Sequence, residues 1–142
     1  MRGFTLIEIL MVIAAMSIIA VLIMPVGFQF YRAQLLDETT YDILNTIRKV
    51  QQYAISQKND SAFGMKFFAT STVLFQGSSY ASRIPSEDET YVYLDGVAVS
   101  GINEIVFAKL TGIPNASSSI VTLTIDNDVH TITINSQGKI ER

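Results

Sequence analysis

The chain has 142 residues, of which 49% are hydrophobic and 16% are charged, and its formal net charge is −3. This length holds one membrane segment and one small domain, and the mixed charges exclude the basic footprint of a dedicated nucleic-acid binder. The absence of cysteine excludes a disulfide framework, a thiolate metal site and a cysteine nucleophile.

The first predicted element is a long apolar helix. Ser17 is the only polar residue between Ile9 and Met24, and the apolar stretch extends from Phe4 to Phe28 with few interruptions. A bilayer core needs about 20 mostly apolar helical residues, so the run is long enough to span a membrane. It differs from an ordinary secretory signal because it is too long and no small-residue cleavage site follows it. Arg2, which precedes the run, favours a cytoplasmic N-terminus.

Residues 29–57 continue with the period of a helix. The apolar side chains that recur on one helical face are Leu36, Ile43, Ile47, Val50 and Ala54. We therefore predict one continuous helix of about 50 residues, apolar all round in its first half and amphipathic in its second. Pro25 removes a backbone hydrogen bond and Gly27 weakens the same turn, so we expect a bend there.

After residues 58–61 the pattern changes to short strands separated by turns. Runs of β-branched and aromatic residues predict strands at 63–68, 72–75, 91–94, 105–108, 120–125 and 129–134. Asp126, Asn127 and Asp128 separate the last two runs and predict a hairpin. The predicted fold class is α+β, with a long N-terminal helix whose outer half packs on an antiparallel β-sheet.

Each polar cluster has a simple structural interpretation. Asp126 and Asp128 have the spacing that opens a calcium loop, but the rest of that pattern is missing, so turn residues are favoured. The acidic run 87–89 could attract a cation weakly, but an exposed loop explains it better. His130, the only histidine, shares a strand face with Ile132, which favours a position at the edge of the core. We therefore expect no enzyme active site, no cofactor and no metal.

Glu8 is an ionisable residue inside the apolar run. A charge at the bilayer centre costs about 3 kcal/mol or more, depending on the method. Near the start of the helix, however, a carboxylate can lie close to the headgroups, and the helix dipole stabilises it. This explains why Glu8 is tolerated, but it does not explain a use for it.

At the N-terminus, Gly3 is followed by Phe4-Thr5-Leu6-Ile7-Glu8 and the long apolar run. This pattern closely resembles the class III signal of type IV pilins and type II secretion pseudopilins, and within the resemblance Arg2 matches the basic leader and Pro25 matches the family's helix-loosening proline. The resemblance implies that a prepilin peptidase cuts after Gly3 and methylates the amine of Phe4. It implies a leader at 1–3, a transmembrane and filament-core helix at 4–28, the amphipathic half of that helix at 29–57, and a β-sheet domain at 58–142.

The resemblance also supplies a partner for Glu8. It implies that this carboxylate pairs with the methylated amine of Phe4 in a neighbouring subunit, which would set the axial register of a helical filament. Pairing of Glu8 with the amine of its own chain, four residues away on the same helix face, is equally compatible with the sequence.

Beyond residue 30, short stretches such as AISQKNDSAFGMKFF and ITINSQGKIE are similar to the GspH/FimT-like minor pilins and pseudopilins. The missing cysteines and calcium loop also favour a minor subunit. The resemblance implies a structural subunit of a type IV pilus or a type II secretion pseudopilus. Such a subunit is held in the bacterial inner membrane by one pass, with its C-terminal domain outside the cytoplasm, until an assembly platform extracts it into the filament.

Two alternatives remain open. Some FimT-like subunits take part in DNA uptake and carry basic residues near their C-terminus, where this chain has Lys139 and Arg142 with Glu141 between them. The net-negative charge argues against strong phosphate binding, and a solvated tail is the simpler interpretation of these residues. The other alternative is a single-pass anchored domain that never polymerises and keeps its N-terminus intact.

Overall fold

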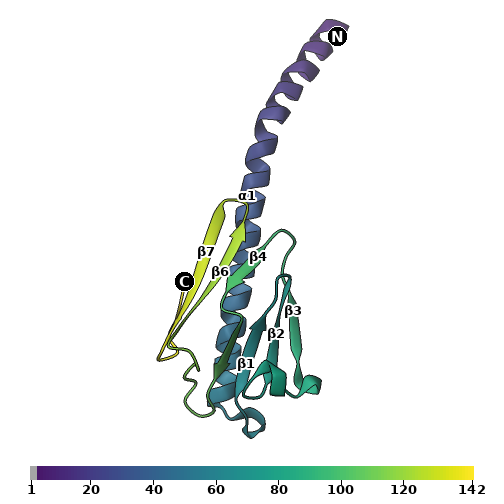
Figure 1. Ribbon diagram of the computed structural model, residues 1–142. Coiled ribbons are helices and arrows are strands. Elements are labelled where there is room, and N and C mark those ends of the chain that lie inside the picture. The colour runs from purple at the N-terminus through teal and green to yellow at the C-terminus, as the bar shows by residue number, and fades with distance from the viewer. Residues whose placement is uncertain (1–2) are drawn as a thin grey trace. The chain divides into compact units, whose positions relative to one another are not determined.

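The computed structural model describes residues 3–142, apart from the side chain of Pro25. Met1 and Arg2 of the predicted leader, and the proline side chain at the predicted bend, therefore lie outside the described residues. The chain divides into two compact units, with the boundary between Gln34 and Leu35. Helix α1 (Leu6–Ile55) contributes to both units (Figure 1).

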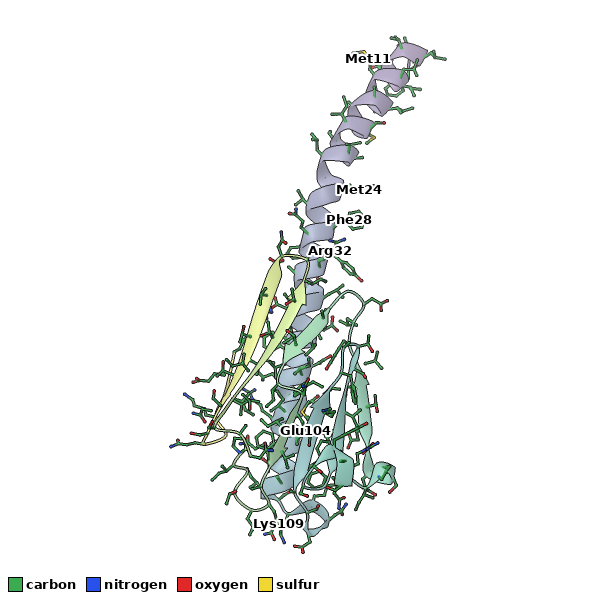
Figure 2. All side chains as sticks on the ribbon, viewed as in Figure 1. Met11, Met24, Phe28, Arg32, Glu104 and Lys109 are labelled. Carbon is green, nitrogen blue, oxygen red and sulfur yellow. The ribbon has the colours of Figure 1, made fainter. Side chains whose placement is uncertain are left out.

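The predicted long helix is confirmed, because α1 extends over 50 residues. Every described side chain from residue 3 to residue 34 is exposed, and Met11 and Met24 are among those that Figure 2 draws along this part of the helix. The hydroxyl of Ser17 donates to the carbonyl oxygen of Ile13 at 2.8 Å. The one polar residue between Ile9 and Met24 is thus satisfied within the helix itself.

From Leu35 onward α1 has one buried face. The residues of the predicted apolar face, Leu36, Ile43, Ile47, Val50 and Ala54, are each at most 3% exposed. They pack in a single hydrophobic core with side chains from both sheets, among them Phe63, Phe107 and Ile132. The amphipathic period therefore identified correctly which face of the helix meets the sheets.

The β region forms two four-stranded antiparallel sheets, whereas the sequence predicted one. The first sheet has the order β3-β2-β1-β5 and the second has the order β4-β6-β7-β8. The strands of the first sheet are β1 (Phe63–Phe67), β2 (Ser71–Gln76), β3 (Glu89–Val92) and β5 (Glu104–Phe107). The strands of the second sheet are β4 (Ala98–Gly101), β6 (Ser118–Ile125), β7 (Asp128–Asn135) and β8 (Ile140–Glu141).

All six predicted strands are present, with small shifts at their ends. The predicted hairpin is confirmed as β6 and β7, which pair from Ile125–Asp128 to Ser118–Asn135. Asp126 takes a positive φ of 50°, a conformation that aspartate tolerates in tight turns. Three short 3₁₀ helices, η1 (Lys58–Asp60), η2 (Tyr80–Ser82) and η3 (Pro85–Glu87), complete the described secondary structure.

Two strands were not predicted, and one predicted loop is partly wrong. Strand β4 escaped the pattern because only Val99 in it is half-buried, and β8 has only two residues. Strand β3 begins at Glu89, so the acidic run 87–89 is not entirely a loop. The alternation rule missed this start because the inward-facing residue is a glutamate, which a helix lysine neutralises.

Candidate functional site

The first turn of α1 is capped by Thr5. The Oγ1 atom of Thr5 accepts a hydrogen bond from the backbone N–H of Glu8 at 3.4 Å, and its carbonyl oxygen accepts from the N–H groups of Glu8 and Ile9 at 3.1 and 3.3 Å. A threonine cap followed three residues later by a glutamate is a capping box, in which the glutamate can return a bond to the cap. The Thr-x-x-Glu spacing from Thr5 to Glu8 is the sequence signal of this cap.

The Glu8 side chain lies on an apolar part of the helix surface. It is exposed, and it borders a shallow hollow of about 290 Å³ together with Phe4, Ile9, Val12 and Ile13. No side chain among residues 3–142 forms a hydrogen bond or ion pair with its carboxylate. If another apolar helix covered this surface, the charge would lose its water and would need a cationic partner.

The two glycines of the N-terminal segment have free space around them. A Cβ atom built on Gly3 or on Gly27 meets no heavy atom within 4 Å. Packing within the described chain therefore gives no reason for a glycine at position 3. A larger residue there is not expected to disturb the fold.

The exposed part of α1 is a very large apolar surface. Leu6, Met11 and Val21 are 79%, 69% and 71% exposed, and their apolar neighbours are similarly open. Among the described residues, α1 is the one helix that is long and apolar enough to cross a membrane or to act as a signal sequence. An exposed apolar surface of this size is typical of a segment that is covered by lipid or by another protein.

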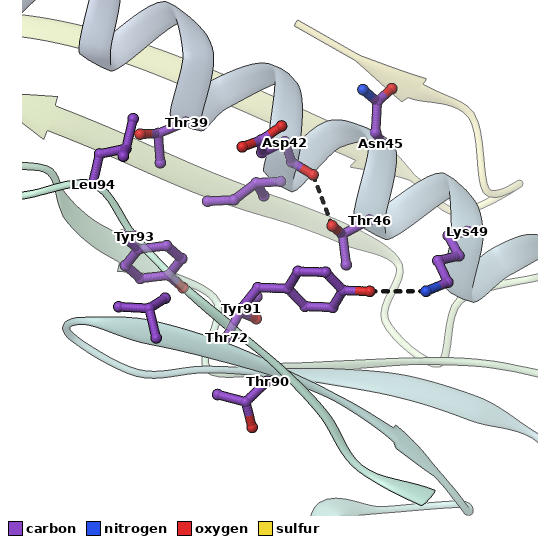
Figure 3. Close-up of a pocket in the computed structure, with 12 residues that line it drawn as sticks. Thr39, Asp42, Asn45, Thr46, Lys49, Thr72, Thr90, Tyr91, Tyr93 and Leu94 are labelled. Atoms are coloured by element: carbon purple, nitrogen blue, oxygen red, sulfur yellow. Dashed lines mark hydrogen bonds between the residues drawn. The ribbon is translucent and has the colours of Figure 1, made fainter.

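The 35–142 unit contains a groove between α1 and the edge strand β3. Its volume is about 550 Å³, and Thr39, Asp42 and Lys49 of the helix face Thr72 of β2, Tyr91 of β3 and Tyr93 just beyond β3 across it (Figure 3). A volume of this size falls within the range of about 300–1,000 Å³ that is typical of ligand clefts.

Two residues of the groove lining, Lys49 and Tyr91, form a hydrogen-bonded cluster with Glu89. Lys49 Nζ donates to Glu89 Oε2 at 2.5 Å and to the hydroxyl oxygen of Tyr91 at 2.8 Å, and the Tyr91 hydroxyl donates to Glu89 Oε2 at 2.7 Å. The bond to Lys49 is the main cause that holds the pKa of Glu89 below its usual value, and the same bond raises the pKa of Lys49. Burial raises the pKa of Tyr91.

These bonds correct the prediction for the acidic run. Glu89 points to the helix and Asp88 binds Arg83 Nε at 2.7 Å, while Glu87 stays exposed. The three acids therefore do not converge on one point. Over residues 3–142, the structure contains no group of three or more His, Cys, Asp or Glu residues placed to hold a metal ion.

The floor of the groove contains a buried hydroxyl without a hydrogen-bond partner. Tyr93 is 8% exposed, and its hydroxyl is one of three buried side-chain polar atoms without a partner among the described residues. Burial raises the pKa of Tyr93 to about 12, against a smaller lowering effect of the neighbouring Thr72 hydroxyl, which does not reach hydrogen-bonding geometry with it. The adjacent Thr72 hydroxyl already donates to the carbonyl oxygen of Lys66 at 3.0 Å.

The C-terminal basic residues are held by carboxylates. Arg142 binds Asp37 of α1, and one of its nitrogens lies 3.1 Å from His130 Nδ1. The same His130 nitrogen lies 3.1 Å from Thr40 Oγ1, which places the histidine at the edge of the core as predicted. The tail is exposed at Glu141 and Arg142, in line with the prediction, but a contact across 105 positions of sequence holds the Arg142 guanidinium on the helix. Lys139 pairs with Glu141.

In comparisons with protein-family models, with curated proteins and with solved structures, the chain matches none. The architecture itself is pilin-like, because a long N-terminal apolar helix packs through its later part against antiparallel β-sheets.

Proposed function

We propose that this chain is a structural subunit, of the minor type, of a type IV pilus or a type II secretion pseudopilus. One observation carries the proposal: a single helix is exposed at its described residues from Leu6 to Gln34 and mostly apolar as far as Phe28, and its later part packs in the core of a folded β domain. A subunit that moves from a bilayer into a bundle of helices needs this combination, since both surroundings cover apolar surface.

In this proposal the N-terminal residues have separate roles. A prepilin peptidase recognises the segment around Gly3, removes the leader and methylates the amine of Phe4. The new N-terminus then lies directly before the Thr5 cap, so cleavage leaves the start of α1 intact. Glu8 pairs with a methylated amine in the filament core, where an uncompensated charge would be costly.

The remaining parts of the chain have structural roles in the same proposal. The apolar part of α1 forms the filament core after it leaves the membrane, and the two sheets form the outer surface. The protein has no enzymatic activity and no cofactor. Two ion pairs argue against the DNA-binding alternative. Lys139 is paired with Glu141 and Arg142 with Asp37, so both cations that would contact phosphate already have an acidic partner.

The decisive experiment is the N-terminal peptide mass of the chain expressed with its own prepilin peptidase. The expected product begins at Phe4 and carries one added methyl group. Gly3→Leu is expected to stay uncleaved and to accumulate in the membrane, because Gly3 has no packing role that would make the variant misfold.

Gly27→Leu is the matched control for this experiment. It replaces a second glycine of the same helix that also has free space around it, and it is expected to be processed normally. A chain that keeps its N-terminus in the presence of active peptidase would support a non-polymerising anchored domain instead. Efficient cleavage of Gly3→Leu would also contradict the proposal.

A further inference from the structure

The first sheet has two edge strands, β5 and β3, and another segment of the chain covers only the first of them among the described residues. At the β5 edge, the segment 113–115 lies against the strand: the N–H of Asn115 donates to the carbonyl oxygen of Val106 at 2.8 Å, and Val106 N–H donates to Asn115 Oδ1 at 3.1 Å. A bridge between Phe107 and Pro114 continues the cover. Backbone groups of the β5 edge thus have hydrogen-bond partners within the chain. Covering an edge strand with a loop is one way in which proteins protect it from pairing with another chain.

The β3 edge has no such cover among the described residues. The N–H of Tyr93 donates to the carbonyl oxygen of Thr70 at 3.0 Å, and the register pairs Tyr91 with Thr72. Because backbone groups alternate in direction along an antiparallel strand, those of Thr90 and Val92 point away from β2 to the open side. Strand β3 also lacks the lysine, proline or bulge that usually blocks an edge, and its Val92 is 77% exposed.

The groove runs along this open edge. Thr90, Tyr91 and Val92 of β3 line it, and Tyr93 and Leu94 just beyond the strand continue the lining. Successive side chains of a strand point to opposite faces of the sheet, so a lining that holds all three β3 residues follows the backbone at the edge of the strand. The free donors and acceptors of Thr90 and Val92 therefore face a space with α1 on its other side.

The polar groups around this space indicate the chemistry of an occupant. Asp42 is an exposed carboxylate that lines the groove, and Glu38, outside the lining itself, is an exposed carboxylate one turn before it on α1. No side chain of residues 3–142 pairs with either. The one cation among the described lining residues, Lys49, is committed to Glu89 and Tyr91. The hydroxyl of Tyr93, more than nine-tenths buried, lines the floor without a partner. An occupant must bring positive charge and hydrogen-bonding groups.

We propose that this groove binds an extended peptide segment of a partner protein that carries a lysine or arginine. The segment adds to the first sheet as a new strand beside β3, through the backbone groups of Thr90 and Val92. Alternate side chains of the segment enter the groove, and its cation meets Asp42 and Glu38. Strand addition between an edge strand and a helix is an established mode of peptide recognition.

The test uses the full chain in lipid nanodiscs. A phage-displayed library of random seven-residue peptides is selected on it and counter-selected on empty nanodiscs. The enriched peptides are expected to be poor in proline and to contain lysine or arginine. The dissociation constant of one synthetic enriched peptide is then measured by fluorescence anisotropy against a set of variants.

Three variants probe the groove. Val92→Pro removes the outward N–H at an exposed position, Asp42→Asn removes one charge, and Tyr93→Phe removes the buried hydroxyl. Each is expected to weaken binding by about tenfold. Val129→Pro is the matched control and is expected to bind as the parent does. It alters an exposed valine of β7. The N–H of Asn135 in the same strand donates to the carbonyl oxygen of Lys139 and so points away from β6. Val129 is an even number of residues from Asn135, so its N–H points away from β6 as well.

The outcomes separate the alternatives. Absence of enrichment over empty nanodiscs, or equal binding by all variants, would overturn the proposal. Loss of binding in Asp42→Asn with full binding in Val92→Pro would overturn strand addition in favour of a cationic side chain alone. The proposal does not rest on filament assembly, because every residue involved lies at or beyond Glu38, and peptide binding is measured independently of N-terminal processing.

Discussion

Glu8 has two physical roles that one pair of substitutions can separate. At the last position of the Thr-x-x-Glu capping-box pattern its side chain can return a bond to the backbone N–H of Thr5, and as a charge it can pair with an amine. Glutamine also serves at this position of a capping box, but it carries no charge.

We therefore expect both Glu8→Gln and Glu8→Ala to be cleaved and inserted normally, and both to be reduced in filament incorporation. Incorporation is measured by quantifying the subunit in sheared or overexpressed filaments, with the parent chain as reference. Normal incorporation of Glu8→Gln together with failure of Glu8→Ala would assign Glu8 a local capping role and remove the ion pair.

Tyr93 provides a prediction about pH. Its folded-state pKa of about 12 lies above the ordinary value of 10.0 because burial disfavours the phenolate. A raised folded pKa means that the stabilising contribution is complete below pH 10.0 and is lost as the pH rises toward about 12.

Tyr93→Phe is expected to lack this part of the alkaline loss of stability. At pH 7 its free energy of unfolding should be unchanged or higher by about 1 kcal/mol, because no partnerless hydroxyl is buried. Urea unfolding of both proteins at pH 7 and across the alkaline range checks this. A decrease of about 2 kcal/mol at pH 7 would show that the hydroxyl has a stabilising partner.

At the level of elements, Gln51 connects α1 to two loops. Its Nε2 atom donates to the carbonyl oxygen of Gly112 at 3.0 Å and to that of Gly138 at 2.8 Å. Both glycines have positive φ, so these turns adopt a backbone conformation that other residues resist. One side chain thus positions the loop after β5 and the turn between β7 and β8.

Gln51→Ala is expected to lower the free energy of unfolding by about 1–3 kcal/mol, because two carbonyl groups lose their donor. Gln52→Ala is the matched control, since Gln52 is the adjacent residue of the same helix and is exposed. Its effect should stay within about 0.5 kcal/mol. Equal effects of the two substitutions in urea unfolding would mean that the bridge contributes nothing specific.

At the level of the whole molecule, the core belongs entirely to one unit. Every buried hydrophobic residue of the described chain lies at or beyond Leu36. The exposed apolar part of α1 therefore lies outside the described core, and its apolar surface calls for a membrane or a partner.

A fragment containing residues 35–142 is expected to be soluble without detergent and to unfold cooperatively. Its melting temperature should lie within a few degrees of that of the β domain in the full chain, measured by near-UV circular dichroism. The full chain is expected to require lipid or detergent. An unfolded or aggregated fragment would show that the first part of α1 supports the core.

The sequence determined the features that depend on neighbours along the chain. A period of 3.6 residues identified the helix and its buried face, from Leu36 to Ala54, and alternation around Asp126 identified the β6–β7 hairpin. These patterns are visible in the sequence because a helix or a hairpin places each side chain by local geometry alone.

Only the tertiary structure decided how these elements meet. The division into two sheets, the pairing of Lys49 with Glu89 and the contact of Arg142 with Asp37 join residues that are distant in sequence. The covered β5 edge and the open β3 edge likewise depend on which loop packs beside which strand in the folded domain. No local period encodes such contacts, because they arise from how complete elements pack around one core.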